Sequence, residues 1–103
     1  MDAFTVLAEP TRRQILAELR AAPRTVNQLA NALDVAQPAM SKHLRVLRDA
    51  GFVSRRGEAQ TRIYRLETQR LAEMDAWLAP FRRLWTRHLD ALGRHLDARK
   101  ESR

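Results

Sequence analysis

The stretch AQPAMSKHLRVLRDAGF, residues 36–52, has the start and stop signals of a single helix. Proline is tolerated in the first turn of a helix, because the N–H that it lacks has no partner there. Glycine is common just after the last turn, where the chain takes a left-handed conformation. Pro38 and Gly51 therefore predict a helix over residues 37–50.

This helix should have two different faces. Met40, Leu44 and Leu47 recur at steps of three and four residues, so they share one side and should pack. Another side has polar and basic residues, namely Pro38, Ser41, Lys42, Arg45 and Arg48. On an isolated helix such a side would simply be solvated. Its role therefore depends on the flanking segments.

Two shorter helices are expected before it. Over Pro10–Arg20, apolar residues have helical spacing and AAP at 21–23 ends the pattern. Thr25 is a good N-cap for a second helix at 26–33, which DVAQP at 34–38 interrupts. The apolar positions that support the two helices are Ile15, Leu16 and Leu19, then Val26, Leu29, Ala30 and Leu33.

A β-hairpin is expected after the cationic helix. FVSRR at 52–56 and TRIYRL at 61–66 are rich in β-branched and aromatic residues, and GEAQ at 57–60 supplies a loop with a glycine. Arginines crowd this hairpin at 55, 56, 62 and 65. From Lys42 to Arg65 the chain has seven basic and two acidic residues, which leaves a charge of +5 on this segment alone.

The last third predicts helix over about 69–98, with an apolar stripe too broad for one small core. Leu71, Met74, Leu78, Phe81, Trp85, His88, Leu92 and His95 form a seven-residue repeat, widened by Trp77, Leu84, Leu89 and Leu96. Pro80 should kink this helix or divide it in two near Ala79. A second copy of the chain is the simplest cover for the stripe, although the helix could also fold back onto its own domain.

Composition limits the classes of function. A chain of 103 residues has room for one domain, 1–103, and its net charge of +7 favours polyanionic partners such as nucleic acid. The absence of cysteine excludes disulfides and thiolate metal sites. No stretch has the length and apolar character of a signal peptide or membrane span, so no membrane partner and a cytoplasmic location are expected.

The order of helix, short helix, basic helix and basic hairpin resembles the ArsR family of bacterial transcriptional repressors. The similarity is carried by LANALDVAQPAMSKHLRVLRDAGFVSRR at 29–56, and extends to FTVLAEPTRRQIL at 4–16, GEAQTRIYRL at 57–66 and LAEMDAWLAPFRRLWTRHLDAL at 71–92. The resemblance implies a mainly α fold with a small β-hairpin wing, that is, a winged helix-turn-helix with N- and C-terminal dimerisation helices. It also implies a homodimer that represses transcription at a palindromic operator, often its own, and releases the DNA on a signal.

The resemblance assigns roles to the elements. Residues 26–33 would support the helix at 37–50, which would read the major groove, while the wing at 53–66 would lie on the flanking backbone. Glutamine suits adenine, serine and histidine offer hydrogen bonds, and lysine and arginine suit guanine or phosphate. The expected DNA contacts are Gln37, Pro38, Ser41, Lys42, His43, Arg45, Arg55, Arg56, Gln60 and Arg62. For His43, simple packing at the helix edge is the alternative, because a histidine in such a place is often simply packed.

The resemblance also implies a dimer interface and, in metal-sensing members, metal sites. The expected interface residues are Phe4, Leu7, Leu78, Phe81, Trp85, His88, Leu89 and Leu92. Thr25 and Asn27 stand where metal-sensing members have cysteines, so that site is absent. On the last helix His88 and His95 share a face near Asp90 and Asp97, but the spacing differs from the family's metal site. We therefore expect no metal or other cofactor, and the inducing signal is unknown.

Ala36 also departs from the family's pattern, because the family often has a hydroxyl residue at this capping position. Its helix start lacks a capping bond worth about 1 kcal/mol unless Gln37 or Asp34 compensates.

Two other classes of function are alternatives to DNA binding. A winged helix can act as a protein-docking module, but such a module needs no cationic helix and cationic wing on one surface. An enzyme is not expected, because no cysteine nucleophile, glycine-rich phosphate loop or serine–histidine–acid arrangement is evident.

Overall fold

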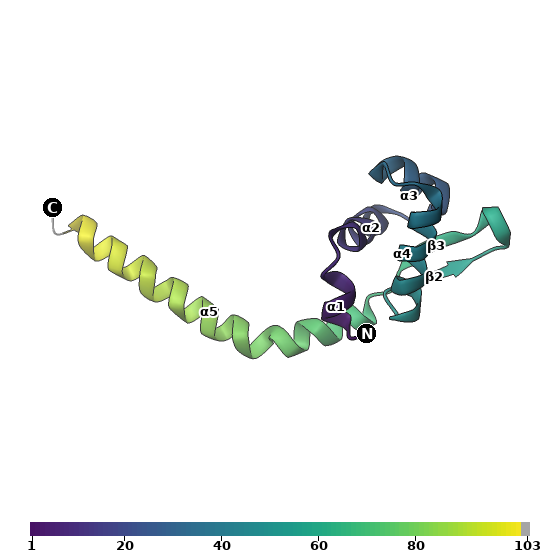
Figure 1. The fold of residues 1–103 in the computed structure, drawn as a ribbon. Helices are drawn as coiled ribbons and strands as arrows, with labels where there is room; N and C mark the ends of the chain where they lie inside the picture. The colour runs from purple at the N-terminus through teal and green to yellow at the C-terminus, as the bar shows by residue number, and fades with distance from the viewer. Residues whose placement is uncertain (102–103) are drawn as a thin grey trace.

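The computed structural model describes residues 1–101, except for the side chains of Gln60 and of residues 97–101. Figure 1 shows a compact group of helices with a hairpin at one end and a long helix leaving at the other. In chain order the elements are α1 (Ala3–Leu7), α2 (Pro10–Ala21), β1 (Arg24–Thr25), α3 (Val26–Leu33), α4 (Gln37–Asp49), β2 (Val53–Arg56), η1 (Ala59–Thr61), β3 (Ile63–Leu66) and α5 (Gln69–Glu101). The fold is therefore mainly α with a small antiparallel sheet, as expected.

The core lies where α2, α3, α4 and the sheet meet. It consists of Val6, Ile15, Leu16, Leu19, Leu29, Ala30, Met40, Leu44, Leu47, Phe52, Val53 and Tyr64. Met40, Leu44 and Leu47 are each 0% exposed, which confirms the predicted apolar face of α4. Complete burial of a side chain of this size stabilises the fold by about 1.5–3 kcal/mol. Packing therefore determines which side of α4 faces outward.

The turn between α3 and α4 is held by local hydrogen bonds. Thr25 caps α3 as predicted: its Oγ1 accepts from the Gln28 N–H at 3.2 Å, while Gln28 Oε1 accepts from the Thr25 N–H at 2.9 Å. At the other end Asp34 takes a left-handed conformation with φ of 53°, and the Val35 N–H donates to the Ala30 carbonyl at 3.0 Å. These bonds define how α4 leaves α3.

The C-terminal end of α4 also follows the prediction. Gly51 has φ of +85°, the left-handed conformation that favours glycine. The Gly51 N–H donates to the Arg48 carbonyl at 3.0 Å, and the Phe52 N–H donates to the Leu47 carbonyl at 2.9 Å. Phe52 and Leu47 are both fully buried in the core, as is usual for the apolar residues at this type of helix end.

The sheet has one strand more than the expected hairpin. Its order is β1-β3-β2, with all pairs antiparallel, and Arg24 and Thr25 of β1 pair with Tyr64 and Ile63 of β3. The expected second strand at 61–66 was too long, because β3 begins only at Ile63. Residues 59–61 form the short 3-10 helix η1, which lengthens the hairpin loop beyond GEAQ. A strand of two residues has no alternation from which it could be predicted.

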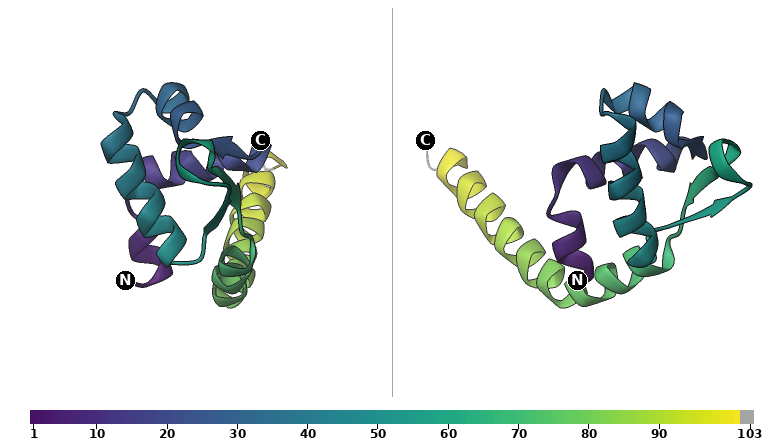
Figure 2. Two further views of the ribbon diagram at one scale, coloured as in Figure 1. Left: turned by 90° about the vertical axis from the view of Figure 1, so that its right-hand side faces the viewer. Right: turned by 45° about the vertical axis from the view of Figure 1, so that its right-hand side comes forward.

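Of the two alternatives for Pro80, a kink or a division near Ala79, the division does not occur, because α5 is one continuous helix through Pro80. Figure 1 shows a change of direction in its first half, as expected near a proline that gives the helix no N–H for the preceding turn. The right-hand view of Figure 2 shows that the second half of α5 extends away from the domain, which gives the molecule a length of 66 Å. No helix in the described part is long and apolar enough to cross a membrane.

Candidate DNA-binding surface

A groove with a volume of about 550 Å³ lies between α4, the start of α3 and the hairpin. Among the expected DNA-contact residues, six line it: Gln37, Ser41, Lys42, Arg45, Arg55 and Arg62. The remaining lining residues are Val26, Asn27, Arg48, Ala59 and Tyr64. Of all the side chains that line the groove, five are basic, and none of the described ones is acidic. The basic ones are Lys42, Arg45, Arg48, Arg55 and Arg62. The groove thus brings the cationic side of α4 and the cationic hairpin onto one surface.

Helical spacing explains the contribution of α4. Gln37, Ser41 and Arg45 are four residues apart and lie one above the other, on a side of the helix next to the face that buries Leu44 and Leu47. Arg48 continues the row by three residues and lines the groove as well. Arg48 belongs to the cationic side that the sequence indicates, although it was not among the expected contacts.

The start of α4 has no side-chain cap. Ala36 has an extended backbone with ψ of 141°, and neither Gln37 nor Asp34 supplies the missing bond. The first N–H groups of a helix have no partner inside it, and they point toward the direction from which an anion would approach. Gln37 and Ala39 contribute two such groups, whereas Pro38 has none. The exposed start of α4 therefore adds a partial positive charge to the groove's end.

A hydrogen bond to a buried residue of the hairpin positions Arg55. Arg55 and Tyr64 are paired across β2 and β3, and the guanidinium Nη1 donates to the Tyr64 hydroxyl at 3.3 Å. Tyr64 is only 5% exposed, so its ring is part of the core while its hydroxyl is directed at the arginine. Arg62 precedes β3 and is half-buried. Both arginines thus approach the groove from a supported backbone rather than from a free loop.

Three expected contact residues do not line the groove, and the side chain of a fourth is not described. Pro38 is exposed in the first turn of α4. Arg56 is exposed too, and because it follows Arg55 directly in β2, its side chain points to the opposite face of the strand. His43 is half-buried. The Thr11 N–H, which donates to the Glu9 carboxylate at the start of α2, lowers the pKa of Glu9. Gln60 lies in η1, and its side chain is outside the described part of the structure.

A second surface consists of exposed apolar side chains on α1 and α5. Of the expected interface residues, Phe4, Leu78, Phe81, Trp85, Leu89 and Leu92 are between 38% and 66% exposed, and His88 is exposed too. Leu7 differs, because it is half-buried and packs against the chain's own core. Trp77, Leu84 and Leu96 belong to the same exposed surface and were missing from the expected interface.

Aromatic rings join the two helices of this surface. The ring of Trp77 lies 5.2 Å from that of Phe4 in α1 and 4.8 Å from that of Phe81, one turn further along α5. All three rings remain roughly half exposed. Their contacts hold α1 against the first half of α5, and they leave apolar rings exposed outside the core.

The positions at which the family's metal sites would lie either have other roles or form no cluster of metal ligands. Thr25 caps α3, and Asn27 lines the groove. His88 and His95 are both exposed on α5, while Asp97 lies outside the described side chains. Nowhere in the described residues do three histidine, cysteine, aspartate or glutamate side chains gather in a possible metal site.

Comparisons with known proteins agree with this geometry. Residues 7–56 match a family described as a helix-turn-helix domain. The chain is 38% identical over 96 residues to the HTH-type transcriptional regulator Rv2034 of Mycobacterium tuberculosis, a match that covers 93% of this chain and 87% of the relative. It is 30% identical to the transcriptional repressor SdpR of Bacillus subtilis, over 78% of this chain and 89% of the relative.

Solved structures have the same fold. The crystal structure of the ArsR family transcriptional regulator RHA00566 has a TM-score of 0.71 and 36% identity, over 81% of this chain and 86% of that one. The homodimeric winged helix-turn-helix DNA-binding domain of Mb0332 from Mycobacterium bovis has a TM-score of 0.61 and 28% identity, over 75% and 71% of the two chains. Helix, turn, helix and basic wing define a DNA-binding regulator of transcription. This chain belongs to the ArsR family of such regulators.

Proposed function

We propose that this chain is a transcriptional repressor that binds a palindromic operator as a homodimer. The observation that carries the proposal is the groove, in which α4 and the hairpin contribute five basic side chains to one surface. Duplex DNA has about one negative charge per 1.7 Å of its axis, so a basic groove of this kind is complementary to its backbone. No comparable argument favours a docking module, since a protein partner would not need basic residues from both elements.

Each element has a task in this proposal. α4 enters the major groove, with Gln37 and Ser41 near its start directed at base edges and Lys42 and Arg45 at guanine or phosphate. Arg55 and Arg62, together with the exposed Arg56, bind the backbone or the minor groove beside it. Arg48 extends the phosphate contacts along α4.

A second copy of the chain is the proposed partner of the apolar surface. Residues 1–103 act as one DNA-binding domain in which the wing spans about 53–66 and the dimerisation surface spans α1 and about 69–98. The exposed rings of Phe4, Trp77, Phe81 and Trp85 are the anchors. Apolar area that becomes buried contributes about 25 cal/mol per Å², from which the cost of association is subtracted. The homodimeric Mb0332 domain supports this assembly.

Repression then follows from occupancy. A dimer bound at a promoter excludes the polymerase. The simplest circuit is one in which the repressor controls the promoter of its own gene. The SdpR relative, named a repressor, supports this direction of control. The signal that releases DNA is a small ligand, a partner protein or the abundance of the repressor itself, because the chain has no thiol for a thiolate site. Such a protein acts in the cytoplasm, where the DNA is.

The proposal is tested with purified protein and a pool of random duplexes. Selected sequences should contain an inverted repeat whose half-site centres are about one helical turn, roughly 10 base pairs, apart or a small multiple of it. Binding should weaken steeply with salt, by about 0.9 log units per neutralised phosphate for each log unit of salt. Selection of a single half-site without its inverted repeat, or a flat response of binding to salt, would contradict the proposal. A chain that retains no duplex but does capture an acidic protein would favour docking.

A further inference from the structure

The start of α5 has a basic residue in an unfavourable place. Arg70 is the second residue of this helix, and the first turn has no acidic residue. The positive end of a helix macrodipole lies there, so a cation in the first turn is disfavoured unless another contact compensates. Arg70 has such a contact, and it lies on a different helix.

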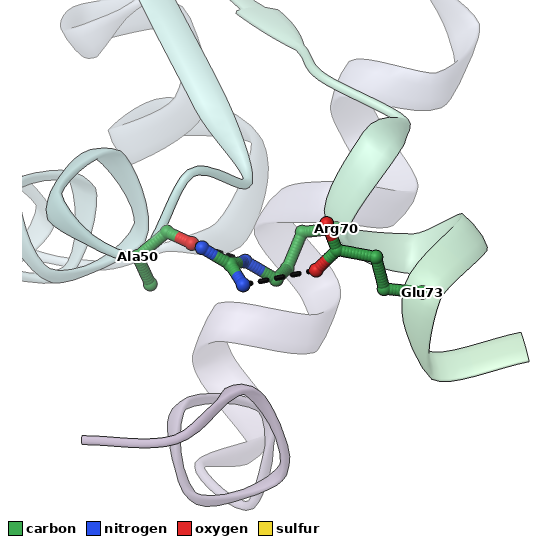
Figure 3. A network of polar contacts seen from close by, with 3 residues as sticks. All are labelled: Ala50, Arg70 and Glu73. Atoms are coloured by element: carbon green, nitrogen blue, oxygen red, sulfur yellow. Dashed lines mark hydrogen bonds and ion pairs between the residues drawn. The ribbon is translucent and has the colours of Figure 1, made fainter. Parts of the chain in front are cut away.

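Arg70 binds the end of α4. Its Nε donates to the Ala50 carbonyl at 3.0 Å, between residues 20 positions apart in the chain, and Ala50 is the last residue of the α4 terminus (Figure 3). Carbonyl groups at a helix end have a partial negative charge, which a guanidinium stabilises. The same guanidinium packs across Gly51: a Cβ placed on Gly51 would lie 3.7 Å from Arg70 Nε and Nη2.

A carboxylate holds the arginine in this position. Glu73, one turn further along α5, accepts from Arg70 Nη1 at 2.9 Å (Figure 3). Both side chains are about half exposed, so the ion pair itself contributes little to stability. The ion pair orients the guanidinium, because it uses Nη1 and leaves Nε free to reach Ala50. A backbone bond from the Glu67 N–H to the Phe52 carbonyl, at 2.9 Å, ties the same two regions together.

We infer that Arg70 is a positioning residue that sets the angle between the DNA-reading helix α4 and the dimerisation helix α5. In a two-fold dimer, this angle determines the distance and tilt between the two copies of α4. Arg70 therefore determines which half-site spacing the repressor accepts, without touching the DNA. The inference rests on the proposed function, since it concerns a dimer with two DNA-reading helices.

The test compares Arg70→Met, which keeps an unbranched, flexible stem and removes the guanidinium, with Arg20→Met. Arg20 is an exposed arginine at the end of α2, outside the groove, so the control removes the same charge. Both proteins are titrated with palindromes whose half-site spacing differs by one or two base pairs, and with a single half-site. Thermal melts establish that each variant is folded.

Arg70→Met should lose about threefold to tenfold in affinity for the best-spaced palindrome and should discriminate less between spacings, while half-site affinity stays within twofold. Arg70→Lys, which can still donate to Ala50, should recover part of the spacing preference. Arg20→Met should leave the profile unchanged. Equal losses on the palindrome and the half-site, or an unchanged spacing profile, would overturn the inference.

A second measurement needs no DNA. The chain has no cysteine, so spin labels on Ala39→Cys and Ala76→Cys report one distance between α4 and α5, and excess unlabelled chain suppresses signals between copies. Both positions are exposed. The distance distribution should broaden or shift in Arg70→Met and not in Arg20→Met, and an unchanged distribution overturns the inference. If the unmodified protein selects no duplex while the distribution responds to Arg70, the proposed function fails and the link between the helices stands.

Discussion

Arg55 and Tyr64 face each other across the hairpin, and the Arg55 guanidinium donates to the Tyr64 hydroxyl at 3.3 Å. Tyr64 is buried in the core, whereas Arg55 lines the basic groove. The hydrogen bond therefore connects a rigid ring to a long side chain that would otherwise sample many rotamers. Since ordering such a side chain on binding has an entropic cost, the contact should prepare Arg55 for DNA.

Replacement of Tyr64→Phe keeps the ring in the core and removes only the hydroxyl. DNA affinity should fall about twofold to fivefold, while the free energy of unfolding changes by less than about 1 kcal/mol. Fluorescence anisotropy with the operator and denaturant unfolding measure the two quantities. In an Arg55→Met background the same substitution should have no further effect on affinity, and an undiminished effect there would mean that Tyr64 acts by another route.

Gln37 and Arg62 should affect DNA binding in different ways. Gln37→Ala should lower affinity for the operator by about fivefold or more and leave random DNA almost unaffected, because a base contact is worth about 1–3 kcal/mol. Arg62→Ala should weaken both duplexes alike and reduce the salt slope by about one per copy. Titrations at several salt concentrations separate these patterns. Matching losses for the two variants on both duplexes would show that α4 does not read bases.

The apolar surface predicts that the dimer depends on Trp85, which is 66% exposed in the single chain. Trp85→Glu places a charge in the proposed interface and should give a monomer that loses the palindromic complex while it keeps weak nonspecific binding. Arg83→Glu is the matched control on the opposite side of α5, and it should remain dimeric. Sedimentation velocity at micromolar concentration gives the answer. A wild-type monomer that binds the specific site one copy at a time would refute the prediction.

DNA affinity should not respond to metals. Zinc, cadmium and arsenite at micromolar levels, and chelators, should leave the binding curve unchanged, because the chain has no thiol and its two α5 histidines stand seven residues apart. Electrophoretic shifts with and without each metal are sufficient. If one metal reversibly abolished binding and His88→Ala removed that effect, the α5 histidines would be a sensing site after all.

Gly57 should be needed for the shape of the hairpin loop. Its φ is +94°, and a Cβ added there would lie 3.0 Å from the Thr61 carbonyl oxygen. Gly57→Ala should therefore lower the free energy of unfolding by about 1–2 kcal/mol and weaken DNA binding through the wing. Gly93→Ala is the control, because it lies inside α5 with nothing within 4 Å of the added Cβ. Equal melting temperatures for both variants would argue against strain at Gly57.

Periodicity made α4 and its surroundings predictable. The spacing of Met40, Leu44 and Leu47 identified the buried face, and this placed Ser41 and Arg45 outside the core. Helix ends at Thr25 and Gly51 were also predictable, because each depends on a residue type with a specific local conformation.

Contacts between distant segments were not predictable in the same way. The stacking of Phe4 on Trp77 and the bond from Arg70 to Ala50 join residues that no local pattern relates. A basic residue at the start of a helix was a signal that could have drawn attention to Arg70. The Pro80 alternatives stayed open because proline destabilises a helix by an amount that neighbouring turns can offset, and the helix continues here.

The missing cap at Ala36 links the stability of the free repressor to its ligand. The first turn of α4 gives up about 1 kcal/mol for want of a side-chain acceptor, and a DNA phosphate can supply that acceptor instead. The nucleic acid would then complete a helix that the polypeptide leaves unfinished. Amide hydrogen exchange at this turn should slow when the operator binds, and a serine introduced at the position would stabilise the unbound repressor while it reduces the advantage that binding confers.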